Sequence, residues 1–265
     1  MKKSIFLFLI AIISTQAITA QNTIDGNRII KVLSFNILHG ATTQGTFDLD
    51  TIAQLIIDAN PDFVALQEVD FQTNRAKKYD LVTELGWRAK LAPIFARAMP
   101  YDDGEYGEGV LSKYSFLQTR NVGLPFSPGN EPRAALEILT ILPSKDTIAF
   151  IGTHLDHTRD ETDRVAQAKA LNAVFTKNKY PTILAGDLNA EPGSTPMNVL
   201  ESVWQAAYDP KNPENTYPST QATKKIDYVL FYPRNRWRVL ETKVIKDAVA
   251  SDHCAYLVTL ELLEK

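Results

Sequence analysis

An acid followed by a histidine, Asp252-His253, stands immediately before the strand-like run CAYLVTLEL near the C-terminus. A carboxylate and an imidazole fixed at a strand end can hold a metal ion and a base in adjacent positions. The tripeptide Ser-Asp-His alone is more often turn chemistry. Its weight comes from four other strand-like runs with polar ends, VLSFN, FVALQE, IAFIGTHLDH and TILAGDLN, and from KIDYVLF, which begins with an acid.

The polar strand ends supply oxygen donors, which are Asn36, Glu68, Asp187, Asn189 and Asp252. Oxygen ligands suit a hard divalent ion, so the sequence predicts Mg²⁺, with Mn²⁺ or Ca²⁺ as alternatives. Zinc is disfavoured because His154, His157 and His253 lack the short spacing typical of zinc ligands.

Two histidines then become candidates for proton transfer or for stabilising a phosphate. His154 and His253 have the right chemistry for a general acid, a general base or a charge stabiliser, and Asp227 has the right type to orient one imidazole. Each polar strand end also has a structural alternative, since Asn36 could terminate a strand and Glu68 could cap a turn. The whole ordered set favours a site.

The elements that must position these side chains alternate strands with helices. Apolar residues at helical spacing predict helices over residues 48–60 and 162–177. Strands are predicted over residues 29–35, 62–67, 88–96, 109–111, 116–122, 134–142, 147–152, 183–186, 226–231, 237–244 and 254–262. Residues 98–108 and 209–223 are predicted to be long loops that line a site. Helices near both ends of a strand-rich middle predict stacked sheets with outer helices.

Length and composition predict one ordinary globular domain. The chain has 265 residues, of which 45% are apolar and 22% are charged, which is enough to bury a large core. A net charge of -3 argues against a protein that holds long nucleic acid by bulk electrostatics, because phosphate neutralisation needs clustered Lys and Arg.

The N-terminus has the pattern of a processing signal. Lys2 and Lys3 precede an apolar run over residues 5–13, and small and polar residues then lead to Ala20. We expect a secretory signal peptide over residues 1–20 and one catalytic domain over residues 21–265, with no transmembrane segment in the mature chain. A buried N-terminal strand is the alternative. The mature protein is expected to be secreted or periplasmic.

The ordered motifs SFNILHG, ALQEVD, GEGVLSK, EPRAALEI, GTHLDH, AGDLNAEPGS, KIDYVLF and SDHCAYLVTL resemble the endonuclease/exonuclease/phosphatase superfamily. That superfamily includes deoxyribonuclease I, exonuclease III-type nucleases, neutral sphingomyelinases and inositol-polyphosphate 5-phosphatases. The resemblance covers essentially the whole mature chain. It implies an α/β (α+β) fold, a four-layer α/β sandwich in which two packed, mostly antiparallel sheets are flanked by helices, with the site at one edge.

The resemblance also implies roles for the oxygen donors. Asn36 and Glu68 would bind the catalytic metal, and Asp252 would lie near it, directly or through water. Asp187 and Asn189 would orient the attacking water and hold the scissile phosphate.

Four further residues receive roles from the resemblance. His253 would pair with Asp227 as the base or as an electrostatic dyad. His154 would hydrogen-bond a non-bridging phosphate oxygen or assist the leaving oxygen. Arg133 would add a bidentate contact to the phosphate.

Substrate contacts are predicted at His39, Tyr106 and His157, with a loop-stabilising role as the alternative for His39. Glu108 stands where an amide is more usual in the GNALLSK-like form of its motif, so recognition of the substrate there departs from the common pattern.

The leading functional hypothesis is a secreted, Mg²⁺-dependent phosphoesterase that acts on a phosphorylated small molecule or a lipid headgroup. The alternative is a secreted or periplasmic nuclease, which the acidic balance does not favour. A non-catalytic phosphate-binding module is the third hypothesis, disfavoured because every residue that the mechanism needs is present.

Overall fold

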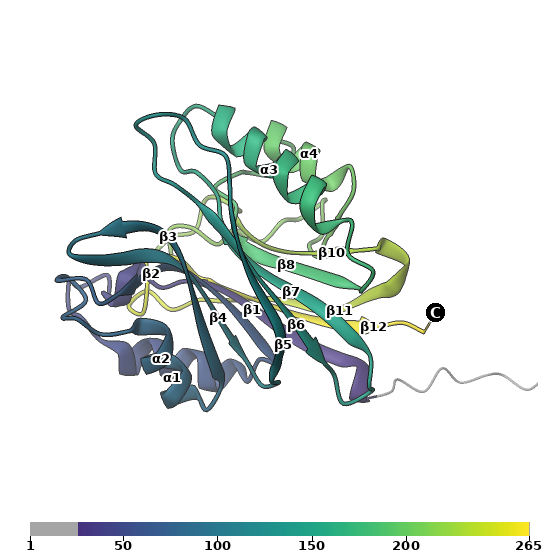
Figure 1. The fold of residues 1–265 in the computed structure, drawn as a ribbon, viewed down its shortest axis with the longest axis horizontal. Helices are drawn as coiled ribbons and strands as arrows, with labels where there is room; N and C mark the ends of the chain where they lie inside the picture. Colours follow the sequence, from purple (N-terminus) through teal and green to yellow (C-terminus); the bar gives the residue numbers. More distant parts are fainter. Residues whose placement is uncertain (1–25, 265) are drawn as a thin grey trace, which may run out of the picture.

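The computed structural model describes residues 26–264. Two six-stranded sheets pack face to face, and Figure 1 shows helices α1 and α2 outside one sheet and α3 and α4 outside the other. This arrangement is the predicted four-layer α/β sandwich, so the predicted fold class is confirmed. The predicted signal peptide over residues 1–20 lies outside the described residues.

The first sheet has the strand order β11-β12-β1-β2-β4-β3. Its strands are β1 (Ile29–Asn36), β2 (Phe63–Phe71), β3 (Ala92–Tyr101), β4 (Gly104–Ser112), β11 (Trp237–Ile245) and β12 (Ala255–Leu262). Only β1 and β2 run parallel, and α1 (Leu49–Ala59) connects them. Helix α2 (Leu81–Ala89) packs beside α1.

The second sheet has the order β5-β6-β7-β8-β10-β9. Its strands are β5 (Phe116–Gly123), β6 (Ala134–Ile141), β7 (Thr147–His154), β8 (Thr182–Asp187), β9 (Gln205–Ala206) and β10 (Asp227–Tyr232). Again one pair is parallel, β7 with β8, and α3 (Thr162–Phe175) connects it. Helix α4 (Thr195–Glu201) packs against α3. Short 3-10 turns cover Gly26–Arg28, Leu38–Gly40 and Arg234–Arg236.

Successive side chains of a strand point to opposite faces of its sheet. One face contributes to the core between the sheets, and the other contributes to a core between that sheet and its helices. In β1, Ile30 and Val32 point between the sheets, whereas Leu33 and Phe35 belong to the cluster under α1. The Phe63 and Phe150 rings stack across the sheets at 5.0 Å between centroids. The lone cysteine, Cys254, is buried in the inner core and has no disulfide.

Both parallel crossovers direct the carboxyl ends of their strands to one edge of the sandwich. Strands β1 and β2 of the first sheet contact β8 of the second, and β2 also contacts β7. The side chains at the ends of these strands therefore meet, although they come from different sheets.

Several sequence-based boundaries are confirmed and others are wrong. The predicted helices over 48–60 and 162–177 are α1 and α3, and residues 209–223 contain no helix or strand. The strand predicted over 88–96 begins only at Ala92, because α2 continues to Ala89 and ends at Lys90 with φ of 56°. Helices α2 and α4 were not predicted.

The predicted long loop over residues 98–108 is also wrong. Strands β3 and β4 form a hairpin there, joined by Asp102 and Asp103, whose φ values are 44° and 57°. Two residues with positive φ give the twist that antiparallel strands need at a tight turn. Among the described residues, no helix has both the length and the apolar character needed to cross a membrane.

Candidate active site

The metal-ligand candidates Asn36 and Glu68 lie side by side on neighbouring strands. Glu68 sits in an irregular stretch of β2, where the register against β4 shifts between Leu66 and Val69, and its φ is 55°. This conformation is costly for a residue with a side chain. The Asn36 amide donates to Glu68 Oε1 at 3.2 Å, and His39 Nδ1 lies 3.5 Å from Glu68 Oε2.

Asn36 is fixed by the segment that carries Asp252. Ser251 Oγ donates to the Asn36 carbonyl at 2.6 Å, and the Leu38 N–H donates to Asn36 Oδ1 at 3.1 Å. The Ser251 hydroxyl also lies 3.4 Å from Asp252 Oδ1. The serine before Asp252 therefore joins the C-terminal motif to the end of β1.

Asp187 is the centre of the site. Its carboxylate is buried, and Oδ2 lies 3.3 Å from Asn36 Nδ2, 3.4 Å from His154 Nε2 and 3.6 Å from His253 Nε2. Burial raises the pKa of Asp187 to about 7, with repulsion from Asp227 adding to the rise and His253 opposing it. Asp187 is therefore able to exchange a proton near neutral pH.

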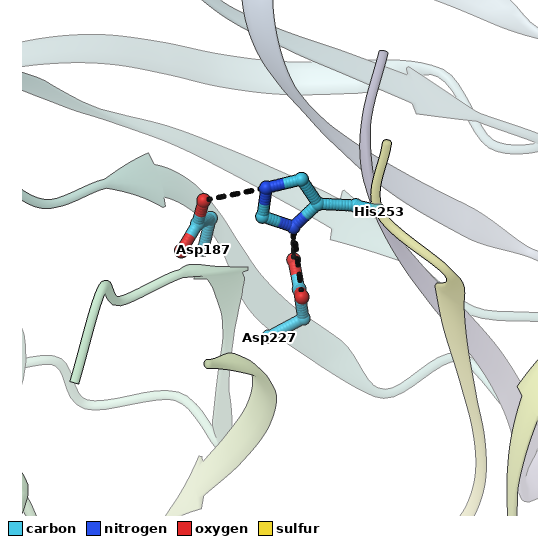
Figure 2. Close-up of side chains that lie close together, drawn as sticks. All are labelled: Asp187, Asp227 and His253. Atoms are coloured by element: carbon cyan, nitrogen blue, oxygen red, sulfur yellow. Dashed lines mark hydrogen bonds and ion pairs between the residues drawn. The ribbon is translucent and has the colours of Figure 1, made fainter. Parts of the chain in front are cut away.

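His253 and Asp227 form the predicted pair. Figure 2 shows the imidazole of His253 between two carboxylates, with Nδ1 at 3.1 Å from Asp227 Oδ2 and Nε2 facing Asp187. Burial opposes the charged ring, but Asp227 and Asp187 outweigh it and raise the pKa of His253 to about 10. In the metal-free protein His253 is therefore an imidazolium at neutral pH.

The geometry around His253 can be interpreted in two ways. Ligand atoms of Asp187, Asp227 and His253 all lie within 4.8 Å of one another, which would suit a metal ion. However, each ring nitrogen already faces one carboxylate. A hydrogen bond to Asp227 and an ion pair with Asp187 explain this arrangement without an ion between the three groups.

His154 lies on the other side of Asp187 in a different environment. Burial lowers its pKa well below the ordinary value, and the positive charge of Arg133 adds to the effect. Arg133 Nη1 is 3.1 Å from His154 Nδ1. Asn189, held at φ of 47°, places its side-chain nitrogen 3.0 Å from His154 Nε2. His154 is therefore a neutral imidazole.

The predicted site residues converge on one cavity of about 690 Å³. All of them line it except Asn36 and Asp227, which are fully buried behind it. The predicted substrate contacts His39, Tyr106 and His157 belong to the lining. Sequence reasoning missed Arg75, Tyr101 and Tyr217, although the last two lie within the stretches predicted to line a site.

Tyr217 is the missed residue closest to the chemistry. Its ring centroid lies 4.8 Å from that of His253, and the preceding Thr216 accepts the Asp227 N–H at 3.2 Å through Oγ1. The residues 216–217 thus support both members of the dyad. Apart from its length, the stretch of residues 209–223 has no sequence feature that predicts these contacts with Asp227 and His253.

The carboxylates that would hold a cation crowd one another, which fits a divalent ion. Burial raises the pKa of Asp252, and the nearby Glu68 raises it further while His253 opposes the shift. Burial also acts on Glu68, but hydrogen bonds from His39 and Asn36 lower its pKa overall, so Glu68 is ionised. Glu68 and Asp252 supply carboxylate oxygens to this corner of the cavity, as Mg²⁺ prefers, and His39 lies beside Glu68.

Comparisons with known proteins agree with this geometry. The chain belongs to the Endonuclease/Exonuclease/phosphatase family, whose model matches residues 33–253. The expected family is thereby confirmed. Its description names nucleases and phosphatases, which are hydrolases of phosphate esters.

Solved structures share the fold at low sequence identity. An endonuclease/exonuclease/phosphatase from Beutenbergia cavernae is 22% identical with a TM-score of 0.73, covering 89% of this chain and 72% of that one. A mannosyl-6-phosphatase from Bacteroides thetaiotaomicron is 18% identical with a TM-score of 0.70, covering 87% and 99%. The catalytic domain of human Nocturnin is 19% identical with a TM-score of 0.71, covering 89% and 94%.

Proposed function

We propose that the protein is a secreted phosphoesterase that requires a divalent ion, most simply Mg²⁺, and hydrolyses a phosphate ester of a small or lipid-linked substrate. One observation carries the proposal. A single cavity brings the carboxylates of Glu68, Asp187 and Asp252 together with His154 and His253. Acids that bind a cation and imidazoles that bind phosphoryl oxygens are the groups that such a reaction needs.

The part of the cavity lining that comes from the β3–β4 hairpin and Arg75 favours a compact polar substrate. The β3–β4 hairpin contributes Tyr101 and Tyr106, and the Arg75 guanidinium lies 4.5 Å from the Tyr101 ring centroid. Arg75 is anchored by Asp70, which accepts two hydrogen bonds from it at 2.7 and 2.8 Å. An aromatic and polar wall suits a sugar or a headgroup, and the similar mannosyl-6-phosphatase makes hexose phosphates reasonable candidates.

Glu68 and Asp252 would hold the ion. Asn36 would orient Glu68 and Asp187, because its amide nitrogen donates to both while its Oδ1 accepts from the Leu38 N–H. When bound, the ion would supply positive charge to a phosphoryl oxygen and acidify a bound water.

The chain's own groups supply the remaining chemistry. Asp187 accepts a proton from the attacking water, because its raised pKa brings it near neutrality. The His253 imidazolium and the neutral His154 ring bind phosphoryl oxygens, and the Asn189 amide adds a further donor at the same place. These roles would put donors next to the phosphoryl oxygens, where negative charge develops.

The test is an activity panel on the purified mature chain. The substrates are mannose 6-phosphate, inositol phosphates, sphingomyelin, bis-p-nitrophenyl phosphate and plasmid DNA, each with Mg²⁺ and with EDTA. We expect turnover of a small or headgroup ester that EDTA abolishes, and Glu68→Gln to reduce both rate and ion dependence. Glu105→Gln, on the outer part of the hairpin, is the matched control.

Two outcomes would contradict the proposal. Full activity in EDTA, or in Glu68→Gln, would remove the metal assignment. Rapid degradation of plasmid DNA at physiological salt, with no activity on the small esters, would favour the nuclease alternative.

Secretion needs a separate measurement. We expect the mature protein to begin at Gln21, which mass spectrometry of protein recovered outside the cytoplasm would establish. Recovery of an intact Met1 in the cytoplasmic fraction would contradict it.

A further inference from the structure

Arg133 is a buried cation whose terminal nitrogens contact protein side chains. An arginine that binds phosphate would leave these nitrogens free for the substrate. Arg133 precedes β6, and its side chain is 1% exposed. Nη1 lies 3.1 Å from His154 Nδ1, and Nη2 lies 3.0 Å from His157 Nδ1 and 2.9 Å from Glu131 Oε2. Both terminal nitrogens are therefore already engaged by protein groups.

The chemistry of guanidinium decides what these contacts mean. Arginine remains protonated in proteins and has N–H donors but no acceptor. An imidazole nitrogen at hydrogen-bond distance from it must therefore present a lone pair. For His154, a lone pair on Nδ1 leaves the ring proton on Nε2.

A second donor competes for the same ring. The side-chain nitrogen of Asn189 lies 3.0 Å from His154 Nε2 and also donates to the Leu155 carbonyl at 3.0 Å. A neutral imidazole accepts only one hydrogen bond in the ring plane, so Arg133 and Asn189 cannot both donate to it. Arg133 also has a hydrogen bond with Tyr106, but its guanidinium can only donate to Nδ1. Asn189 has another acceptor in Leu155, and Asp187 Oδ2 lies 3.4 Å from His154 Nε2, where it can accept the ring proton.

We infer that Arg133 is a positioning residue that fixes the tautomer of His154, with the proton on Nε2, so that this ring meets the phosphoryl group as a neutral donor. The inference rests on the proposed function for the substrate. It replaces the expected bidentate contact between Arg133 and phosphate. It also frees the second N–H of Asn189 for a phosphoryl oxygen.

The decisive experiment is nitrogen NMR on protein labelled at histidine, without metal or substrate. The chain has four histidines, and His154→Gln identifies the signals of His154. We expect a protonated Nε2 and a bare Nδ1 in the native chain. Arg133→Met should shift the ring toward the Nδ1–H form or a mixture, whereas Arg133→Lys, which keeps a donor, should retain part of the native signature.

A protonated Nδ1 on His154 in the native chain would overturn the inference, and so would an unchanged tautomer in Arg133→Met. Because these measurements use the free protein, they hold whether or not the proposed substrate class is right. Arg120→Met is the matched control, since Arg120 lies in the same sheet and pairs with Glu137 at 2.7 Å away from the cavity. It should leave the His154 signals unchanged.

Kinetics with a substrate from the panel separate positioning from binding. Arg133→Met should lower kcat about 100-fold, the size of effect seen when one donor to a developing anion is lost, with little change in KM. A large rise in KM at unchanged kcat would instead make Arg133 a phosphate contact and overturn the positioning role.

Discussion

His154 and His253 face the same oxygen of Asp187, at 3.4 and 3.6 Å, but they differ in what stands behind the ring. Arg133 lies behind Nδ1 of His154, and Asp227 lies behind Nδ1 of His253. A cation at that position keeps one imidazole neutral, and a carboxylate keeps the other charged. Both rings are almost fully buried, and burial lowers the pKa of each, so the carboxylates around His253 account for the difference in charge.

The difference in charge gives the two histidines different roles at the phosphoryl group. His253 can offer a positive charge that lies close to the proposed nucleophile position beside Asp187. His154 can offer a dipole that needs no counter-charge. A site with two imidazolium ions around one buried carboxylate would repel itself, and a site with two neutral rings would stabilise less charge.

The largest expected effect comes from removing the charged ring. His253→Gln should lower kcat by roughly 10³-fold or more, whereas His154→Gln should cost about 10²-fold, because a charged donor contributes more than a neutral one. Steady-state kinetics on a substrate from the panel measure both. Equal losses in the two variants would mean that the difference in charge has no catalytic consequence.

The next effect concerns the group behind His253. Asp227→Asn should lower kcat by about 10²- to 10⁴-fold, the range for losing positioned acid–base help, while leaving metal binding intact. The double variant with His253→Gln should lose little more than the worse single one, because residues that act as a unit are not additive. Losses that simply sum in free energy would show that the two residues act independently.

The sequence was sufficient to predict this pair but not the other. Asp227 and His253 each stand at the end of a recognisable strand motif, so their types and order indicate a dyad. The contact of Arg133 with His154 depends on the antiparallel register that places Ala135 opposite Thr153. No local pattern encodes that register, so Arg133 was predicted as a phosphate contact.

The environment of Glu108 could not be predicted from the sequence either. Its motif indicated an unusual acid, but not that the side chain is fully buried with neither oxygen hydrogen-bonded among the described residues. Burial raises its pKa to about 8, although Arg133 opposes the shift. The β3–β4 hairpin, in contrast, had a usable signal, since Asp102-Asp103-Gly104 is typical turn chemistry between strands.

A smaller effect is expected in the dependence of rate on pH. Activity should rise as Asp187 loses its proton near pH 7 and fall as His253 loses its proton near pH 10. A bound cation moves the acidic limb to lower pH, because it favours the carboxylate. In His253→Gln the alkaline limb should disappear, and the acidic limb should move to higher pH because the charge of His253 lowers the pKa of Asp187. An alkaline limb that persists in this variant would assign it to another group.

The smallest effect is expected in the dependence of the free energy of unfolding on pH. Here His253 and Lys225 contribute with opposite signs. Lys225 is 1% exposed, and its ammonium group lies 3.2 Å from the Tyr256 ring centroid and donates to the Asp227 carbonyl. Burial lowers its pKa from 10.5 to about 7, although Asp227 opposes the shift. Lys225 therefore has a depressed folded-state pKa directly behind the dyad, where His253 has a raised one.

The two shifts have opposite consequences between about pH 8 and pH 10. The folded state holds a proton on His253 that the unfolded chain has lost, so this contribution to stability falls as pH rises toward 10. The unfolded chain holds a proton on Lys225 that the folded state has lost, so that contribution rises with pH. Each slope is at most about 1.4 kcal/mol per pH unit, and in the native chain they largely cancel.

Single substitutions should expose each slope. In urea denaturation with EDTA present, the free energy of unfolding of the native chain should change little over this range. It should rise with pH in His253→Gln and fall with pH in Lys225→Met, where methionine preserves the packing against Tyr256. Lys243→Met, at an exposed position of β11, is the control and should follow the native curve. Parallel curves for all four proteins would contradict the opposite charge states inferred for the dyad histidine and the lysine behind it.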